Sequence, residues 1–162
     1  MIACDDGGTS GSKYDGVYEL TVHQSKTNCE ADTWTDEEIP DPYFRLQAQS
    51  FFGEDVIAWS DCTSPNLGTC EDSMSFTESF VWKDGVWQQH MTMSYFSQGE
   101  CTLSYRSAVL EETETGIQWE AVVKAGKVAV PTEDDCEPEL AEEREDELTC
   151  ESIDFYQAVR VN

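Results

Sequence analysis

The stretch "VWKDGVWQQHMTMSYFSQGECTLSYRSAVLEETETGIQWEAVVKA" (residues 81–125) decides the fold class of this chain. Apolar and polar residues alternate along it, so that residues such as Trp87 and Met91 share one face. Such alternation is typical of β-strands that bury one face in a core. Asp84-Gly85 accepts the positive φ angles of a tight hairpin turn, and short glycine-containing links precede the next two strands. The stretch therefore predicts consecutive antiparallel strands.

The same alternation recurs on both sides of this stretch. The chain as a whole predicts eight strands, at residues 17–24, 43–50, 55–61, 74–82, 86–96, 101–112, 117–125 and 153–161. Two links are longer, residues 25–42 and residues 128–152. The second contains "PELAEEREDEL" (138–148), in which a proline precedes strong helix formers, so it predicts one short acidic helix.

These elements predict an all-β architecture. A meander of eight strands leaves two sheet edges exposed unless it closes, and closure into an up-and-down barrel removes both edges. We therefore expect a barrel with one short helix before the last strand, and a disulfide-stapled β-sandwich is the alternative. The chain divides into an N-terminal tether, residues 1–13, and a single domain, residues 14–162.

The order of the elements resembles the lipocalin and calycin barrels. Gly16-Val17-Tyr18 stands where that family has Gly-x-Trp at the start of its first strand. A long first loop, tight hairpins and a helix before the final strand follow, as they do in the family. The resemblance implies an eight-stranded barrel that holds a small ligand.

The N-terminus resembles the end of a bacterial lipoprotein signal. Ile2-Ala3-Cys4 matches the last positions of that motif, in which the cysteine is acylated, and a glycine- and serine-rich tether follows. The chain also resembles small cysteine-containing lipoproteins of myxobacteria-like soil bacteria. Both resemblances imply an exported protein of the cell envelope or the extracellular space, with a membrane contact only through lipid on Cys4.

The remaining six cysteines predict three disulfides. None belongs to a Cys-x-x-Cys pair, the spacing typical of zinc ribbons and of thioredoxin-type redox sites. The thiols of an exported chain are oxidised to disulfides. Six cysteines allow 15 pairings. Local spacing favours Cys62–Cys70, which flank a turn-rich loop, and Cys136–Cys150, which bracket one acidic segment, and this leaves Cys29 and Cys101 to pair across the fold.

The charge of the chain restricts its partners. The 162 residues include 34 acids and 9 bases, for a net charge of -25. Such a surface repels nucleic acid and favours cationic partners. The sequence lacks the Gly-x-Ser-x-Gly, His-Glu-x-x-His, P-loop and dinucleotide motifs, so it predicts no enzyme, no metal site and no cofactor. A hydrolase built on two of the many carboxylates is the weakest alternative.

Glu78 interrupts the apolar face of the fourth predicted strand. If that face points inward, the carboxylate needs a partner such as Arg45 or Arg106, and it could anchor a ligand in the barrel. The alternatives are a structural ion pair and a bulge that turns Glu78 outward. The first hypothesis is therefore a binding module for a small apolar or amphipathic ligand, and the second is a cell-surface interaction protein with a filled core. The predicted ligand-binding residues are Phe76, Glu78, Phe80, Trp82, Met91 and Met93.

Overall fold

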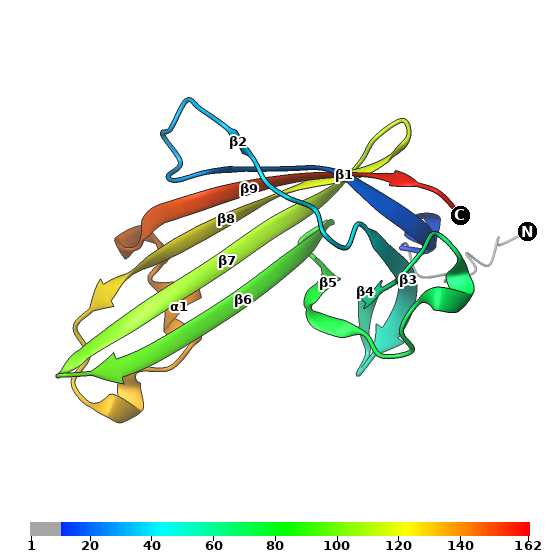
Figure 1. The fold of residues 1–162 in the computed structure, drawn as a ribbon. Coiled ribbons are helices and arrows are strands. Elements are labelled where there is room, and N and C mark those ends of the chain that lie inside the picture. Colours follow the sequence, from blue (N-terminus) through cyan, green and yellow to red (C-terminus); the bar gives the residue numbers. More distant parts are fainter. Residues whose placement is uncertain (1–10) are drawn as a thin grey trace, which may run out of the picture.

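The computed structural model describes residues 11–162 and contains one antiparallel sheet that closes into a barrel (Figure 1). Neighbouring strands follow one another in sequence, and β1 also pairs with the last strand, β9. The barrel strands are β1 (Gly16–Lys26), β3 (Tyr43–Phe51), β4 (Glu54–Asp61), β5 (Ser75–Lys83), β6 (Val86–Ser97), β7 (Glu100–Glu112), β8 (Gly116–Val128) and β9 (Thr149–Arg160). A two-residue strand, β2 (Thr35–Asp36), pairs with the end of β1. The predicted barrel is confirmed, and the sandwich alternative is wrong.

Two-residue turns set the register of the hairpins. Asp84 and Gly85 have φ angles of 54° and 82°, as the sequence predicted for the turn between β5 and β6. The β3–β4 turn uses Phe52 and Gly53, with φ angles of 48° and 81°. A phenylalanine rarely adopts a positive φ angle, so Phe52 does not mark this turn as Asp84 marks the other.

The barrel interior is packed with aromatic side chains at the end where the chain enters. The short 3-10 helix η1 (Ser12–Tyr14) lies across this end, and Tyr14 is buried. A Cβ atom on Gly11 would lie 2.8 Å from the Trp87 ring, which shows how closely the backbone packs there. Gly11 is buried, whereas Ser12 and Lys13 of η1 are exposed. The predicted lipidation site, Cys4, lies outside the described residues.

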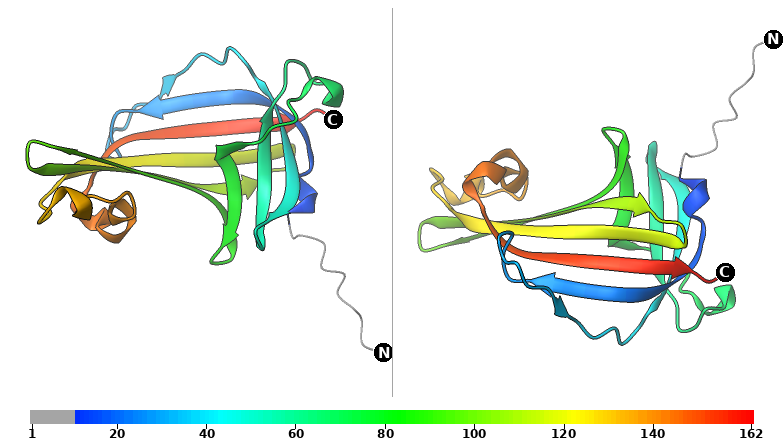
Figure 2. Two further views of the ribbon diagram at one scale, coloured as in Figure 1. Left: turned by 90° about the horizontal axis from the view of Figure 1, so that it is seen from below. Right: turned by 90° about the horizontal axis from the view of Figure 1, so that it is seen from above.

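A second core lies on the outer face of the sheet. Leu103 and Tyr105 of β7 point outward and are covered by the acidic segment between β8 and β9. Figure 2 shows this segment against the end of the sheet that projects past the shorter strands β3 to β5. The predicted helix is shorter than expected: α1 spans Leu140–Glu143, and the 3-10 turns η3 (Glu133–Asp135) and η4 (Glu145–Glu147) flank it. Repulsion between closely spaced acids opposes a longer helix.

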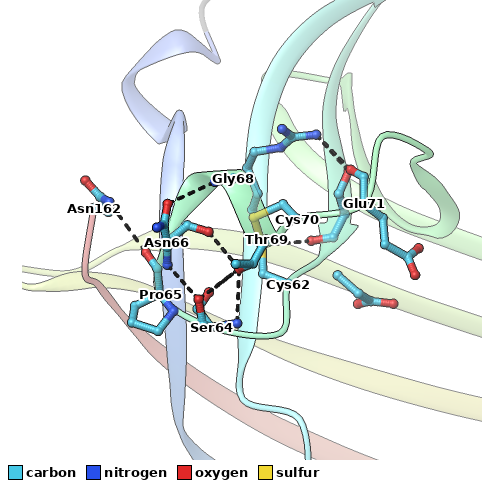
Figure 3. The surroundings of a disulfide bond; sticks show 12 residues. Cys62, Ser64, Pro65, Asn66, Gly68, Thr69, Cys70, Glu71 and Asn162 are labelled. Carbon is cyan, nitrogen blue, oxygen red and sulfur yellow. Dashed lines mark hydrogen bonds between the residues drawn. A yellow bond between two sulfur atoms is a disulfide. The ribbon is translucent and has the colours of Figure 1, made fainter.

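Three disulfides form, and one of them has the predicted partners. Cys62 and Cys70 face each other across the loop after β4, with their Cα atoms 3.9 Å apart (Figure 3). Hydrogen bonds inside this loop support the pairing: the Ser64 and Thr69 hydroxyls lie 2.9 Å apart, and Gly68 donates its backbone N–H to the Asn66 side chain. Three disulfides are compatible with an exported protein.

The other two predicted pairings are wrong. The structure joins Cys29 to Cys150 and Cys101 to Cys136. Closure of the barrel places the end of β1 beside the start of β9, so the loop with Cys29 meets Cys150. The acidic segment lies over β7, so Cys136 meets Cys101. Both contacts depend on tertiary packing, which local spacing in the sequence does not report.

Candidate functional site

A cavity of about 400 Å³ lies inside the barrel beyond its filled end. Side chains from most of the strands line it, and four carboxylates lie around it. The lining residues used below are Trp59, Asp61, Glu78, Gln89, Arg106, Trp119 and Tyr156.

Aromatic rings form the apolar wall of the cavity. Trp119 stacks on Tyr156, with ring centroids 4.9 Å apart, and meets the edge of Trp59 at 5.8 Å. Phe44 stacks behind Trp59 at 3.7 Å and holds its ring in place. Burial raises the pKa of Tyr156 above its usual value, because the ionised phenolate would lose water contacts, and nearby Asp154 adds to the effect. The wall is therefore rigid and apolar, apart from neutral phenol and indole groups.

Arg106 supplies a cation at the cavity. Its Nη1 donates to Oε1 of Gln89 at 2.9 Å, and the Gln89 amide nitrogen donates to the Glu78 carbonyl on β5. Gln89 is buried, so the two side chains form a fixed bridge from β7 to β5. Within residues 11–162, no carboxylate lies within salt-bridge distance of Arg106. The Tyr156 phenol also lies close to the guanidinium, which acts to lower the pKa of that phenol, and Arg106 has five N–H donors in all, so donors beyond the one used by Gln89 can serve a ligand.

The four carboxylates that line the cavity belong to exposed residues. Asp61 accepts a hydrogen bond from the Trp59 indole nitrogen at 3.0 Å, so it also fixes the orientation of that ring. Asp41, Glu71 and Glu78 complete the set, and all are exposed. A ligand that enters must pass these negative charges.

A bulge in β5 explains the position of Glu78. Ile57 of β4 pairs with Phe80, but Trp59, two residues on, pairs with Ser75, so β5 carries extra residues between these points. The Ser79 hydroxyl holds the bulge, because it accepts from the Trp59 backbone N–H at 3.0 Å and donates to the Ser75 carbonyl at 2.6 Å. Glu78 therefore lies at the rim of the cavity and is exposed, as the bulge alternative predicted, and its backbone carbonyl contacts Gln89.

The other predicted ligand-binding residues are not gathered in the cavity. Phe80 is fully buried in the barrel core, whereas Phe76 is 68% exposed beside Phe51 and outside the barrel. Trp82 packs on Trp87 and is partly exposed. Met91 and Met93 follow Gln89 on the same face of β6, and Met93 is exposed. Phe76 and Glu78 thus do not share the inward face of Phe80, because the bulge interrupts the alternation between Ser75 and Phe80. Trp82 lies beyond the bulge and keeps that face, opposite Trp87, but it does not line the cavity.

Sequence reasoning missed the role of several cavity residues. Trp59 and Trp119 were visible on predicted strands, but an aromatic residue in a strand is more often part of a filled core. Arg106 lies on the side of β7 that looked polar, opposite Leu103 and Tyr105. That strand buries both faces, one in the barrel and one under the acidic segment, so apolar residues did not mark the inner side.

Within residues 11–162, no group of three His, Cys, Asp or Glu side chains could hold a metal ion. No helix in this part of the chain has the length and apolar character needed to cross a membrane. No family model, no curated protein and no solved structure matches the chain at a significant level.

Proposed function

We propose that the protein is a binding module that holds a small amphipathic ligand in the barrel cavity. The apolar part of the ligand packs against Trp59, Trp119 and Tyr156, and its polar end accepts hydrogen bonds from Arg106. The observation that carries this proposal is the combination of an aromatic wall with a guanidinium that has no carboxylate partner among residues 11–162. Small-molecule sites combine apolar surface with polar groups that orient the ligand, and this cavity has both.

Arg106 is the preferred anchor, in place of Glu78. A carboxylate, carbonyl or hydroxyl oxygen of a ligand can accept from the unused N–H groups, and Gln89 keeps the guanidinium in position. Glu78 lies at the rim, where its carboxylate contacts solvent and acts on the ligand only at entry.

The three disulfides support a location outside the reducing cytoplasm. We include export, and acylation at Cys4, in the proposal. The barrel would then present its cavity from the cell envelope.

Tryptophan fluorescence can test the proposal, since two indoles line the cavity. Dodecanoate, dodecanol and dodecylamine, each kept below its micelle concentration, serve as probes with one chain and three head groups. We expect dodecanoate to change the emission saturably, and Arg106→Gln to weaken its binding about tenfold through loss of a charge-assisted hydrogen bond.

Lys127→Gln removes an exposed cation of β8 outside the cavity and is the matched control, with unchanged binding expected. If none of the three probes binds, the cavity does not hold amphipathic molecules and the proposal is wrong. If all three probes bind Arg106→Gln and Lys127→Gln equally well, Arg106 is not the anchor, but the cavity remains the binding site.

A further inference from the structure

One edge of β6 has no strand beside it over most of its length. β5 pairs with β6 only at Val86–Gln88, whereas the pairing with β7 continues to Ser97. Among residues 11–162, no other strand pairs with β6 on this side. The outer half of β6 therefore presents backbone groups to solvent (Figure 1).

The hairpin geometry identifies the unpaired groups. Ser97 and Glu100 flank the two-residue turn between β6 and β7, so their backbone groups face each other. The direction of the backbone groups alternates along a strand, so Ser97 and every second residue before it face β7, and the residues between them face the unpaired edge. The N–H and C=O groups that point outward belong to His90, Thr92, Ser94 and Phe96.

The chemistry of β6 fits the addition of a further strand. β6 is the one strand of the described chain that contains no Asp, Glu, Lys or Arg. Proteins usually protect an exposed edge with charges, prolines or bulges, and β6 has none of these. On its inner face, Met93 and Tyr95 are 58% and 68% exposed, so an added strand would cover apolar surface.

The outer face beside this edge is strongly acidic. The Ser94 hydroxyl donates to the Cys136 carbonyl at 2.9 Å, which places the acidic segment directly at the edge strand. Residues 129–148 carry ten acidic residues and one basic residue. Two copies of this chain joined through β6 would bring two such segments together, so charge disfavours self-pairing.

We propose that the β6 edge binds an extended segment of a cationic partner protein, in which basic and apolar residues alternate. The backbone of the segment pairs with His90, Thr92, Ser94 and Phe96. Its apolar side chains cover Met93 and Tyr95, and its basic side chains, on the opposite face, reach the acidic segment. The proposal is independent of the cavity ligand, because it uses the edge and outer face of the sheet.

The test uses the full chain and a short peptide in which lysine and valine alternate. There are two control peptides. The glutamate peptide has glutamate in place of every lysine, and the block peptide has the same lysines and valines arranged in two blocks. We expect the alternating lysine peptide to bind and to slow amide hydrogen exchange at the four outward-facing residues. The glutamate peptide should not bind, and the block peptide should bind more weakly without protecting the edge.

Thr92→Pro removes one outward N–H and leaves the pairing with β7 intact, so we expect peptide affinity to fall about tenfold or more. Thr92→Val keeps the N–H and is the matched control, with affinity unchanged. Tyr95→Lys is a second variant at an exposed site, and its added cation should also weaken binding.

Three results would overturn the proposal. Unprotected edge amides in the presence of bound peptide would show diffuse charge attraction instead of strand addition. Equal affinity of Thr92→Pro and Thr92→Val would show that the edge backbone is not used. Edge protection that rises with protein concentration in the absence of peptide would identify a second copy as the occupant.

Discussion

Tyr18 connects the first strand to the last at the filled end of the barrel. Its hydroxyl donates to the Tyr14 carbonyl at 2.8 Å and accepts from Nη2 of Arg160 at 2.8 Å. The Arg160 guanidinium also lies over the Tyr18 ring, 5.4 Å from its centroid. The aromatic residue of the Gly16-x-Tyr18 motif is therefore fully buried and fastens η1, β1 and β9 together.

Tyr105 makes stability sensitive to alkaline pH. Burial raises the pKa of its phenol from 10.0 to about 12, and the carboxylates of Glu142 and Glu145 add to the effect. The unfolded chain loses this proton first, so stability is complete below pH about 10 and falls as pH rises toward about 12. Between pH 9 and pH 11, we expect the unfolding free energy of Tyr105→Phe to fall less than that of the native chain. Urea unfolding at each pH measures this difference.

Tyr95→Phe is the control for this measurement, because Tyr95 is exposed. Its pH dependence should match that of the native chain. Tyr18 and Tyr156 also have raised pKa values, so part of the alkaline loss will remain in Tyr105→Phe. An unchanged alkaline loss in Tyr105→Phe would contradict the assignment.

At the scale of elements, the three disulfides fasten connections of different lengths. The sequence separation between the two cysteines is 121 for Cys29–Cys150, 35 for Cys101–Cys136 and 8 for Cys62–Cys70. A cross-link restricts the unfolded chain more when it closes a longer loop. We expect paired Cys→Ala replacement to cost about 2 to 5 kcal/mol of unfolding free energy, with the largest loss for the longest loop.

Chemical unfolding of the three double variants measures this order. Loss of Cys101–Cys136 should also release the acidic segment from β7, because repulsion among its acids then has no covalent restraint. Limited proteolysis should cut this double variant within residues 129–148 sooner than the other two. Equal cleavage of all three would show that the second core alone holds the segment.

For the whole molecule, the net charge of -25 opposes compaction. Raising NaCl from about 0.01 M to about 0.15 M shortens the range of charge repulsion from about 30 Å to about 8 Å. The folded state places its acids closer together than the unfolded chain does, so we expect Tm to rise with salt. Calorimetry at both concentrations tests this, with equimolar uncharged sucrose as the control for exclusion effects. A fall in Tm would mean that the described ion pairs contribute more than the repulsion costs.

Sequence alone determined the parts of the fold that depend on local periodicity. Alternation located all eight barrel strands, and Asp84-Gly85 located a turn, because a period of two and a positive φ angle are local properties. The cysteine count predicted three disulfides, and the spacing of Cys62 and Cys70 predicted one pairing. These features are local in the sequence and do not depend on which strands lie side by side.

Tertiary structure decided which residues meet. Closure of β1 on β9 joined Cys29 to Cys150, and the Ser79-held bulge turned Glu78 to the rim. The acidic segment covers the outer side of β7, so the opposite side, with Arg106, faces the cavity. Alternation shows that a strand has two faces, but packing against distant segments decides which face is inside and what it contacts.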